Sequence, residues 1–142
     1  TLSFCKERCQ IRSKLLQIIT PGLNKYLHGY NVPFDRHREK ANARIDACNS
    51  LLIVGYGFND DHLETHLSPA IRSGRKTLII AKTLSLRALQ LIETSPDVIA
   101  FEFGKNGSQE GTVVWQGKDS KFLAGIHLWD MDTMVTEVFG ND

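Results

Sequence analysis

The stretch GYGFNDDHLETHL, residues 55–67, follows directly on the apolar run SLLIV of residues 50–54 and decides the fold of this chain. Four consecutive apolar residues after Ser50 predict a buried strand. The two glycines that flank Tyr56 predict a tight turn at the end of this strand, because glycine adopts backbone conformations that other residues avoid. The sequence therefore places a strand and a glycine turn next to each other in its middle.

The polar step Asn59-Asp60-Asp61 then leads into a predicted helix at about residues 61–73. Leu63, Leu67 and Ile71 share one face of that helix, and Gly74 suits the position just after its end. A strand, a glycine turn and a helix N-terminus in this order are how open α/β sheets build nucleotide or anion sites. Glycine lets the backbone approach the ligand, and the helix offers unpaired N–H groups.

Predicted helices and strands alternate on both sides of this segment. Asp35 is the predicted cap of one helix, and Thr83 or Ser85 of another, while Ser68-Pro69 is a predicted restart of the helix after the turn. Strands that read as continuous apolar runs and alternate with helices predict an α/β fold with a mainly parallel sheet of three to four strands, covered on both faces. The further helices are expected at about 4–19, 34–48 and 85–94, and the strands at 50–55, 77–81 and 98–103.

The last forty residues differ in character. Residues 104–111 are polar and rich in glycine and predict a loop, and residues 112–115 predict a short strand. After an apolar stretch at 122–129, Asp130 is the predicted cap of a final amphipathic helix.

Composition excludes several classes of function as the main theme. The 142 residues are 42% hydrophobic and 23% charged, which is ordinary for one globular domain. A net charge of +1 argues against direct nucleic-acid binding and against a membrane-surface protein. No apolar run approaches the roughly 20 residues that cross a bilayer. With no secretory leader and three cysteines in no framework spacing, we expect a cytoplasmic protein.

Several segments together resemble the C-terminal half of the sirtuin-like domain of bacterial anti-phage defence proteins. The most specific is the GYGFND turn with the His-Leu that follows it, and the resemblance covers nearly the whole chain. The other segments are IITPGLNKYLHGYNVPF (18–34), IDAC (45–48), TLIIAKTLS (77–85), VVWQG (113–117) and FLAGIHLWDMDTMVTEVFG (122–140).

The resemblance implies a Rossmann-like NAD-binding fold and an NAD⁺ glycohydrolase that releases nicotinamide. Gly55 and Gly57 fall where sirtuins place a glycine-serine turn that contacts the nucleotide ribose and phosphates. Gly57 occupies the hydroxyl position, a departure that leaves only backbone donors. Where the family has an asparagine near the adenosine ribose, this chain has Lys82 and Thr83. A contact from Lys82 to a phosphate or ribose edge is a guess from its chemistry, not a role carried over from the family.

The family's first phosphate loop and its catalytic Asn or Asp and His precede this region, and no such loop occurs here. Because the chain begins at Thr1 rather than Met, we expect a piece of a longer protein. Residues 1–49 are expected to be a helical entry segment and connector, and residues 50–142 the C-terminal half of the NAD-binding domain. We therefore expect no catalysis from the chain alone, although the parent protein is expected to hydrolyse NAD⁺.

Three histidines allow other interpretations. Tyr26-Leu-His28-Gly29 is superficially similar to the family's catalytic Leu-His-Gly segment, which makes His28 a weak candidate for a general base. A histidine in a surface or interface loop is the favoured interpretation. His62 and His66 have the helical spacing of a metal pair, but Leu63 stands where a metalloprotease needs glutamate, and no third ligand is obvious. We expect no metal site.

Cysteines and acidic residues have simpler interpretations. Cys5 and Cys9 are helically spaced, but three cysteines cannot form the four-thiolate zinc cluster of protein-deacylating sirtuins. Asp60 and Asp61 could act as acid and base, yet a helix N-cap with a favourable dipole interaction is the favoured interpretation. Carboxylates also suit a ribose hydroxyl better than a phosphate.

The sequence thus predicts an NAD site and leaves two alternatives open. The predicted NAD-facing residues are Gly55, Tyr56, Gly57, Phe58, Asn59, Asp60, His62, Lys82 and Thr83, with Asp61 in support. Expected partners are NAD or ADP-ribose, the upstream remainder of the domain, and either further copies of the chain or another defence protein. One alternative is a non-catalytic module that senses a nucleotide or forms oligomers. The other is a metal-dependent hydrolase that uses His62 and His66.

Overall fold

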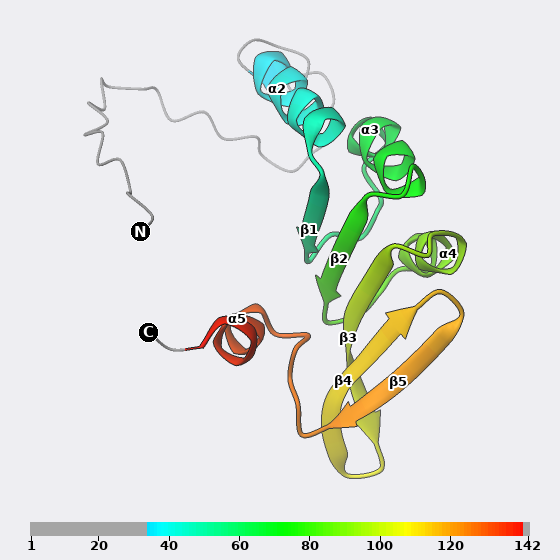
Figure 1. The fold of residues 1–142 in the computed structure, drawn as a ribbon, viewed down its shortest axis with the longest axis vertical. Coiled ribbons are helices and arrows are strands. Elements are labelled where there is room, and N and C mark those ends of the chain that lie inside the picture. Colours follow the sequence, from blue (N-terminus) through cyan, green and yellow to red (C-terminus); the bar gives the residue numbers. More distant parts are fainter. Residues whose placement is uncertain (1–33, 141–142) are drawn as a thin grey trace, which may run out of the picture. The chain divides into compact units, whose positions relative to one another are not determined.

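The structure, a computed structural model, describes residues 34–140 of the chain. The chain divides into two compact units, residues 1–37 and 38–142, and nearly all of the described residues belong to the second. The described elements are α2 (Phe34–Ala47), β1 (Ser50–Val54), α3 (Asp61–Arg72), β2 (Lys76–Ala81), α4 (Leu86–Thr94), β3 (Val98–Asn106), β4 (Gln109–Gln116), β5 (Asp119–Ala124) and α5 (Met131–Phe139) (Figure 1).

The five strands form one mixed sheet in the order β1-β2-β3-β4-β5. β1 pairs with β2 and β2 with β3 in parallel, whereas β3–β4 and β4–β5 are antiparallel. The expected mainly parallel, Rossmann-like sheet of three to four strands is therefore wrong. The parallel part is limited to β1–β3, and the sheet continues as an antiparallel meander.

Two glycine turns explain the error. The predicted loop at 104–111 is instead the end of β3, a turn and the start of β4, with Asn106 paired to Gln109. Gly107 has φ +62° and Gly117 has φ +61°, and each opens a two-residue turn between antiparallel strands. Glycine at the first central position matches the II′ hairpin geometry. The dipeptides at 107–108 and 117–118 therefore carried a hairpin signal that the polar composition concealed.

One glycine inside a strand also misled the loop prediction. Gly111 lies in β4, and a Cβ there would overlap the backbone carbonyl oxygen of Leu123 on β5. The residue is therefore glycine because two strands approach closely at this point, not because the chain turns.

The helices follow the sequence closely. The predicted helices at 34–48, 61–73 and 85–94 correspond to α2, α3 and α4. Asp35 lies inside α2 rather than at its cap, and α3 continues through Pro69 without a restart. Ser85 caps α4 by accepting from the Ala88 N–H, and Gly74 follows α3 with φ +88°, as expected. The predicted helix at 4–19 lies outside the described residues.

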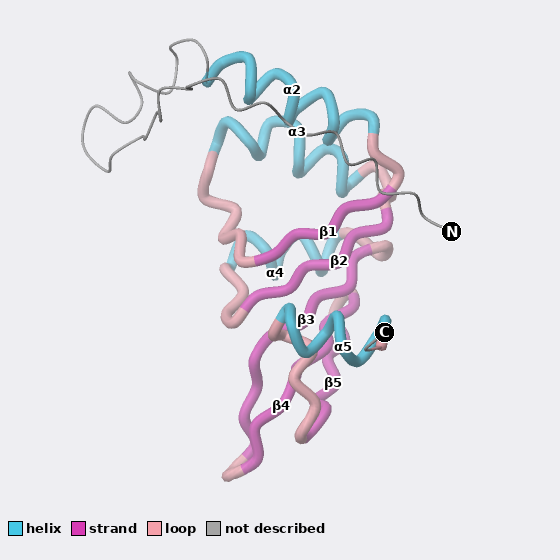
Figure 2. The backbone as a smooth tube through the Cα atoms, turned by 90° about the vertical axis from the view of Figure 1, so that its left-hand side faces the viewer, coloured by secondary structure: helices cyan, strands magenta, loops and turns pink. Residues whose placement is uncertain are grey.

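The two faces of the sheet are covered unequally. α3 and α4 lie on one face, where Ile53, Ile71, Ile79, Ile92 and Val98 belong to the main hydrophobic core. α5 lies on the opposite face, in front of the strands in the view of Figure 2. Because side chains alternate along a strand, each strand of the parallel part contributes to both faces.

Arg75 fixes the end of α2 to the start of β2. Its guanidinium donates to the backbone carbonyls of Ile45 at 2.7 Å and Asp46 at 2.6 Å. The last turn of a helix leaves such carbonyls without partners, so this contact satisfies two of them. Among residues 34–140, no helix has the length and apolar character needed to cross a bilayer.

Candidate functional site

Two turns lie side by side at the carboxyl edge of the parallel strands. We call residues 55–60, which follow β1, the first turn, and residues 82–85, which follow β2, the second turn. The Gly55 N–H donates to the Ile80 carbonyl at 2.8 Å, so the first turn begins against the end of β2. Open α/β sheets bind ligands outside the carboxyl ends of their strands, where the strand order reverses. The strands described here run in the order β1-β2-β3 without a reversal, so the two turns lie on one continuous edge.

The first turn has two residues in the left-handed region. Gly55 has φ +65°, which glycine adopts without strain, but Phe58 also has φ +56°. The Phe58 side chain is only 1% exposed and packs into the core, with its ring centroid 4.9 Å from that of Tyr56. Such a backbone costs about 1–3 kcal/mol, which burial of the ring offsets. Of Phe58, only the main chain can therefore face a ligand.

Gly57 is not required by the fold. Its φ is not in the left-handed region, and a Cβ would meet only the Asn59 side-chain amide nitrogen, at 3.0 Å. That atom is the far end of an exposed, flexible side chain. Any strict need for glycine at position 57 would therefore come from a ligand and not from the packing of the chain.

Asp60 caps α3, as the favoured interpretation of the sequence expected. Its carboxylate accepts from the backbone N–H groups of His62 at 3.1 Å and Leu63 at 3.3 Å. A capping side chain satisfies donors that would otherwise be free for an anion. The start of α3 is therefore already occupied by a negative charge, which disfavours a phosphate there.

Arg87 of α4, which no pattern in the sequence indicated, holds the first turn. Its Nη1 atom donates to the Phe58 carbonyl at 3.1 Å and lies 3.5 Å from carboxylate oxygens of both Asp61 and Glu64. The partners are 23 to 29 residues away along the chain. No local spacing signals a contact of this kind, so only the tertiary structure reveals it.

Tyr56 contributes a neutral hydrogen-bond donor. Its hydroxyl donates to the Asp60 carbonyl at 3.4 Å. Burial raises the pKa of Tyr56 above its ordinary value, although the hydrogen bond to Asp60 acts in the opposite direction. The phenol therefore stays protonated at neutral pH and helps to order the turn.

The second turn is exposed and basic. Lys82 and Thr83 are both exposed, and Lys82 has no ion-pair partner among the residues that the structure describes. Behind them, the Leu84 N–H donates to the Glu102 carboxylate at 2.8 Å, and the Trp115 indole N–H donates to the same carboxylate at 2.9 Å. An acidic first turn and a basic second turn thus lie next to each other at the same edge.

His62 and His66, four residues apart on α3, have different surroundings. His66 Nδ1 lies 3.0 Å from the Asp46 carboxylate, so this side chain joins α3 to α2. His62 is the second residue of α3 and is half-buried. Within residues 34–140, no three histidine, cysteine or acidic side chains are grouped so that they could hold a metal ion. His28, Cys5 and Cys9 lie outside the described residues.

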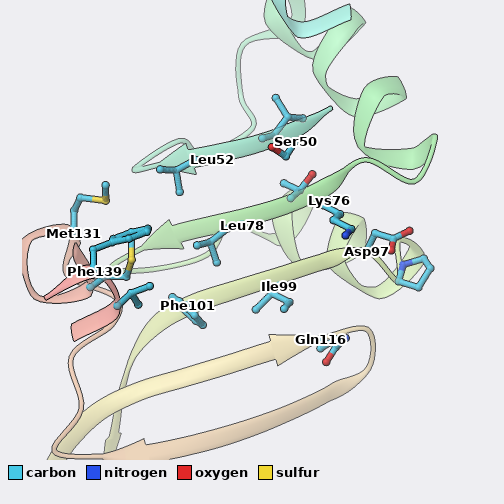
Figure 3. A pocket seen from close by; sticks show the side chains of 15 residues that line it. Ser50, Leu52, Lys76, Leu78, Asp97, Ile99, Phe101, Gln116, Met131 and Phe139 are labelled. Carbon is cyan, nitrogen blue, oxygen red and sulfur yellow. The ribbon is translucent and has the colours of Figure 1, made fainter. Parts of the chain in front are cut away.

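A separate apolar groove of about 710 Å³ lies on the other face of the sheet, between the strands and α5 (Figure 3). We call it the α5 groove. Its lining includes Leu52, Leu78, Ile99 and Phe101 from the strands and Met134 and Phe139 from α5. Leu52 is 53% exposed and Phe139 is 73% exposed, so much of this apolar surface is open.

Comparison with protein-family models, with curated proteins and with solved structures finds no match to this chain. The resemblance to sirtuin-like domains therefore rests on the sequence segments quoted above. The geometry of the two turns supports a ligand site on separate, physical grounds.

Proposed function

We propose that the two turns form one wall of a site for NAD or ADP-ribose. The observation that carries the proposal is the adjacency of the turns at the carboxyl ends of two neighbouring parallel strands, joined by the hydrogen bond from Gly55 to Ile80. In open α/β sheets, ligands bind outside the carboxyl ends of the strands. Two adjacent turns at this edge could contact one molecule together.

Charge suggests how such a molecule would lie. The carboxylates of Asp60 on the first turn and of Asp61 at the start of α3 suit the hydroxyl groups of a ribose, which donate hydrogen bonds to them. The Lys82 ammonium on the second turn suits a phosphate. An adenosine diphosphate-ribose offers both groups within one molecule, whereas a simple anion would meet the carboxylates and be repelled.

We further propose that the parent protein is a sirtuin-like NAD⁺ glycohydrolase that acts in bacterial antiviral defence. The support is the resemblance, together with the open α5 groove, since parallel strands are normally covered on both faces. The upstream remainder of the domain would supply the missing wall and the catalytic groups. The described turns supply carboxylates, a lysine and backbone donors, which bind and orient a nucleotide. We expect no nicotinamide release from the chain alone.

Calorimetry of residues 1–142 with ADP-ribose and with NAD⁺ tests the binding proposal. Saturable binding that weakens at least tenfold in Lys82→Glu, and also in Asp61→Asn, would support it. Leu86→Ser is a matched control, because Leu86 is 79% exposed on α4 and lies outside both turns. Absence of saturable binding by the wild-type chain, or binding that appears only after zinc is added, would refute the nucleotide site.

Gly57→Ala and Gly57→Asp sharpen the same experiment. Since the fold tolerates a Cβ at this position, both variants should keep the thermal stability of the wild-type chain. If a nucleotide approaches the backbone here, the aspartate should abolish binding and alanine should weaken it. Equal binding by all three chains would place the ligand away from this glycine.

The alternative, a non-catalytic module for assembly or nucleotide sensing, is favoured by one observation. The α5 groove lies on the face of the sheet that α5 covers, and it exposes large apolar side chains. Apolar patches of this kind mark protein contacts. Nicotinamide release by the full-length parent protein, lost in the Lys82→Glu variant, would decide for the enzyme. Assembly without any NAD⁺ turnover in the parent would decide for the module.

A further inference from the structure

The second turn is held by a carboxylate on the neighbouring strand. Glu102 lies on β3, in register with Ala81, the last residue of β2. One of its carboxylate oxygens accepts from the Leu84 N–H at 2.8 Å, and the other accepts from the Trp115 indole at 2.9 Å. Both bonds are charge-assisted, which makes them stronger than bonds between neutral groups.

This arrangement separates Glu102 from an ordinary surface carboxylate. Its side chain is half-buried beneath the second turn, and Leu84 is only 6% exposed. A half-buried carboxylate needs hydrogen-bond donors, and both of its donors come from other elements. Its position therefore fixes the second turn at Leu84, two residues after Lys82.

Trp115 in turn fixes Glu102. The indole lies on β4, packs against the hydrophobic core and points its N–H at the carboxylate. In the antiparallel pairing of β3 and β4, Ala100 lies opposite Trp115 and Glu102 lies opposite Val113. This register places the side chains of Glu102 and Trp115 diagonally across the two strands on one face. A rigid chain of contacts thus runs from β4 through Glu102 to the turn that carries Lys82 and Thr83.

We propose that Glu102 is a positioning residue of the nucleotide site, which holds Lys82 and Thr83 in place to meet the ligand, and that Trp115 reports on its occupancy. This inference rests on the proposed function of the two turns. It extends that function to a residue that touches no ligand itself. Preorganised binding groups lose less freedom on binding, so loss of the two hydrogen bonds to Glu102 should weaken affinity.

The test compares Glu102→Ala, Glu102→Gln and Trp115→Phe in the full 142-residue chain, with Leu86→Ser as control. ADP-ribose affinity by calorimetry should fall about tenfold in Glu102→Ala and by less than about threefold in Glu102→Gln, which keeps an acceptor for the Leu84 N–H. Hydrogen exchange at the Leu84 amide should accelerate in Glu102→Ala and stay slow in the control. Wild-type tryptophan fluorescence should change with ADP-ribose, and this change should disappear in Trp115→Phe.

The outcomes distinguish a failure of the positioning role of Glu102 from a failure of the nucleotide site itself. If the wild-type chain binds ADP-ribose and Glu102→Ala binds it equally well, the inference is overturned while the nucleotide site stands. If the wild-type chain does not bind, both fail. Should Glu102→Ala not fold, as judged by circular dichroism, Glu102→Gln and Trp115→Phe carry the test. Trp115→Phe removes the donor to Glu102 while it keeps an aromatic ring against the core, and it should weaken affinity about threefold. Unchanged affinity and fluorescence response in Trp115→Phe would overturn the inference.

Discussion

The two faces of the sheet contain the same kinds of side chain but differ in what covers them. On the face of α3 and α4, Ile79 is 0% exposed, whereas on the face of α5 Leu52 is 53% exposed and Ile99 is 38% exposed. Apolar composition therefore did not decide burial here. The position of the helices decided it, because only the first face has two helices packed along the parallel strands.

This difference locates stability and function in separate parts of the molecule. The face covered by α3 and α4, which we call the closed face, anchors the first turn through Phe58 and supports the second turn through Leu84. The face of α5, which we call the open face, exposes Leu52 and Ile99 and offers the α5 groove to a partner. Four substitutions, ordered by expected effect, test this division.

Ile79→Ala should give the largest loss of stability. The side chain is fully buried between β2 and the helices of the closed face, and its truncation leaves a cavity. The free energy of unfolding should fall by about 2–5 kcal/mol. Urea denaturation followed by circular dichroism measures the change. A loss below about 1 kcal/mol would show that the closed face is not the main core.

Met134→Ala should give a smaller and more local effect. Met134 is 3% exposed and is the only buried residue recorded in α5, so it anchors this helix. We expect a loss near the lower end of the range for core methionines, about 2 kcal/mol, because α5 can detach without unfolding the rest. Hydrogen exchange should accelerate in α5 but not in α4. Equal acceleration in both helices would contradict a local role.

Asp130→Ala should destabilise α5 in a pH-dependent way. The Thr133 backbone N–H, and then the Thr133 hydroxyl, lower the pKa of Asp130 below its ordinary value. A lowered pKa stabilises the folded chain above the unfolded pKa, and this stabilisation is lost as pH falls through the folded pKa. At pH 7 the variant should melt a few degrees lower than wild type, and the gap should close under strongly acidic conditions.

Asp132→Ala is the matched control for the cap. It is also an acidic residue in the first turn of α5, but its side chain accepts no hydrogen bond that the structure records. A pH-independent gap for Asp130→Ala, or the same gap for Asp132→Ala, would show that the cap is not the cause.

Leu52→Ser on the open face should give the smallest effect. Half of the side chain is already in water, so the free energy of unfolding should change by less than about 1 kcal/mol. Sedimentation of the wild-type chain and of Leu52→Ser would also show whether the face of α5 holds copies of the chain together. A loss of stability as large as that of Ile79→Ala would mean that the open face is covered in solution, and the comparison of the faces would fail.

Much of the secondary structure could be predicted from sequence. Apolar runs gave β1, β2 and β3, and caps such as Ser85 and Asp130 marked helix starts, because these signals act over a few residues. The antiparallel half was missed where glycines had two meanings. Gly107 makes a hairpin turn, while Gly111 lies inside a strand. Composition alone does not distinguish these uses.

The candidate site divides in the same way. The sequence by itself determined the glycine turn after β1 and the capping role of Asp60, since both depend on adjacent residues. Only the tertiary structure placed the second turn beside the first, turned Phe58 into the core, and brought Arg87 and Glu102 to the two turns. These contacts join residues 18 to 29 positions apart, and strand order and register set them, which no local pattern encodes.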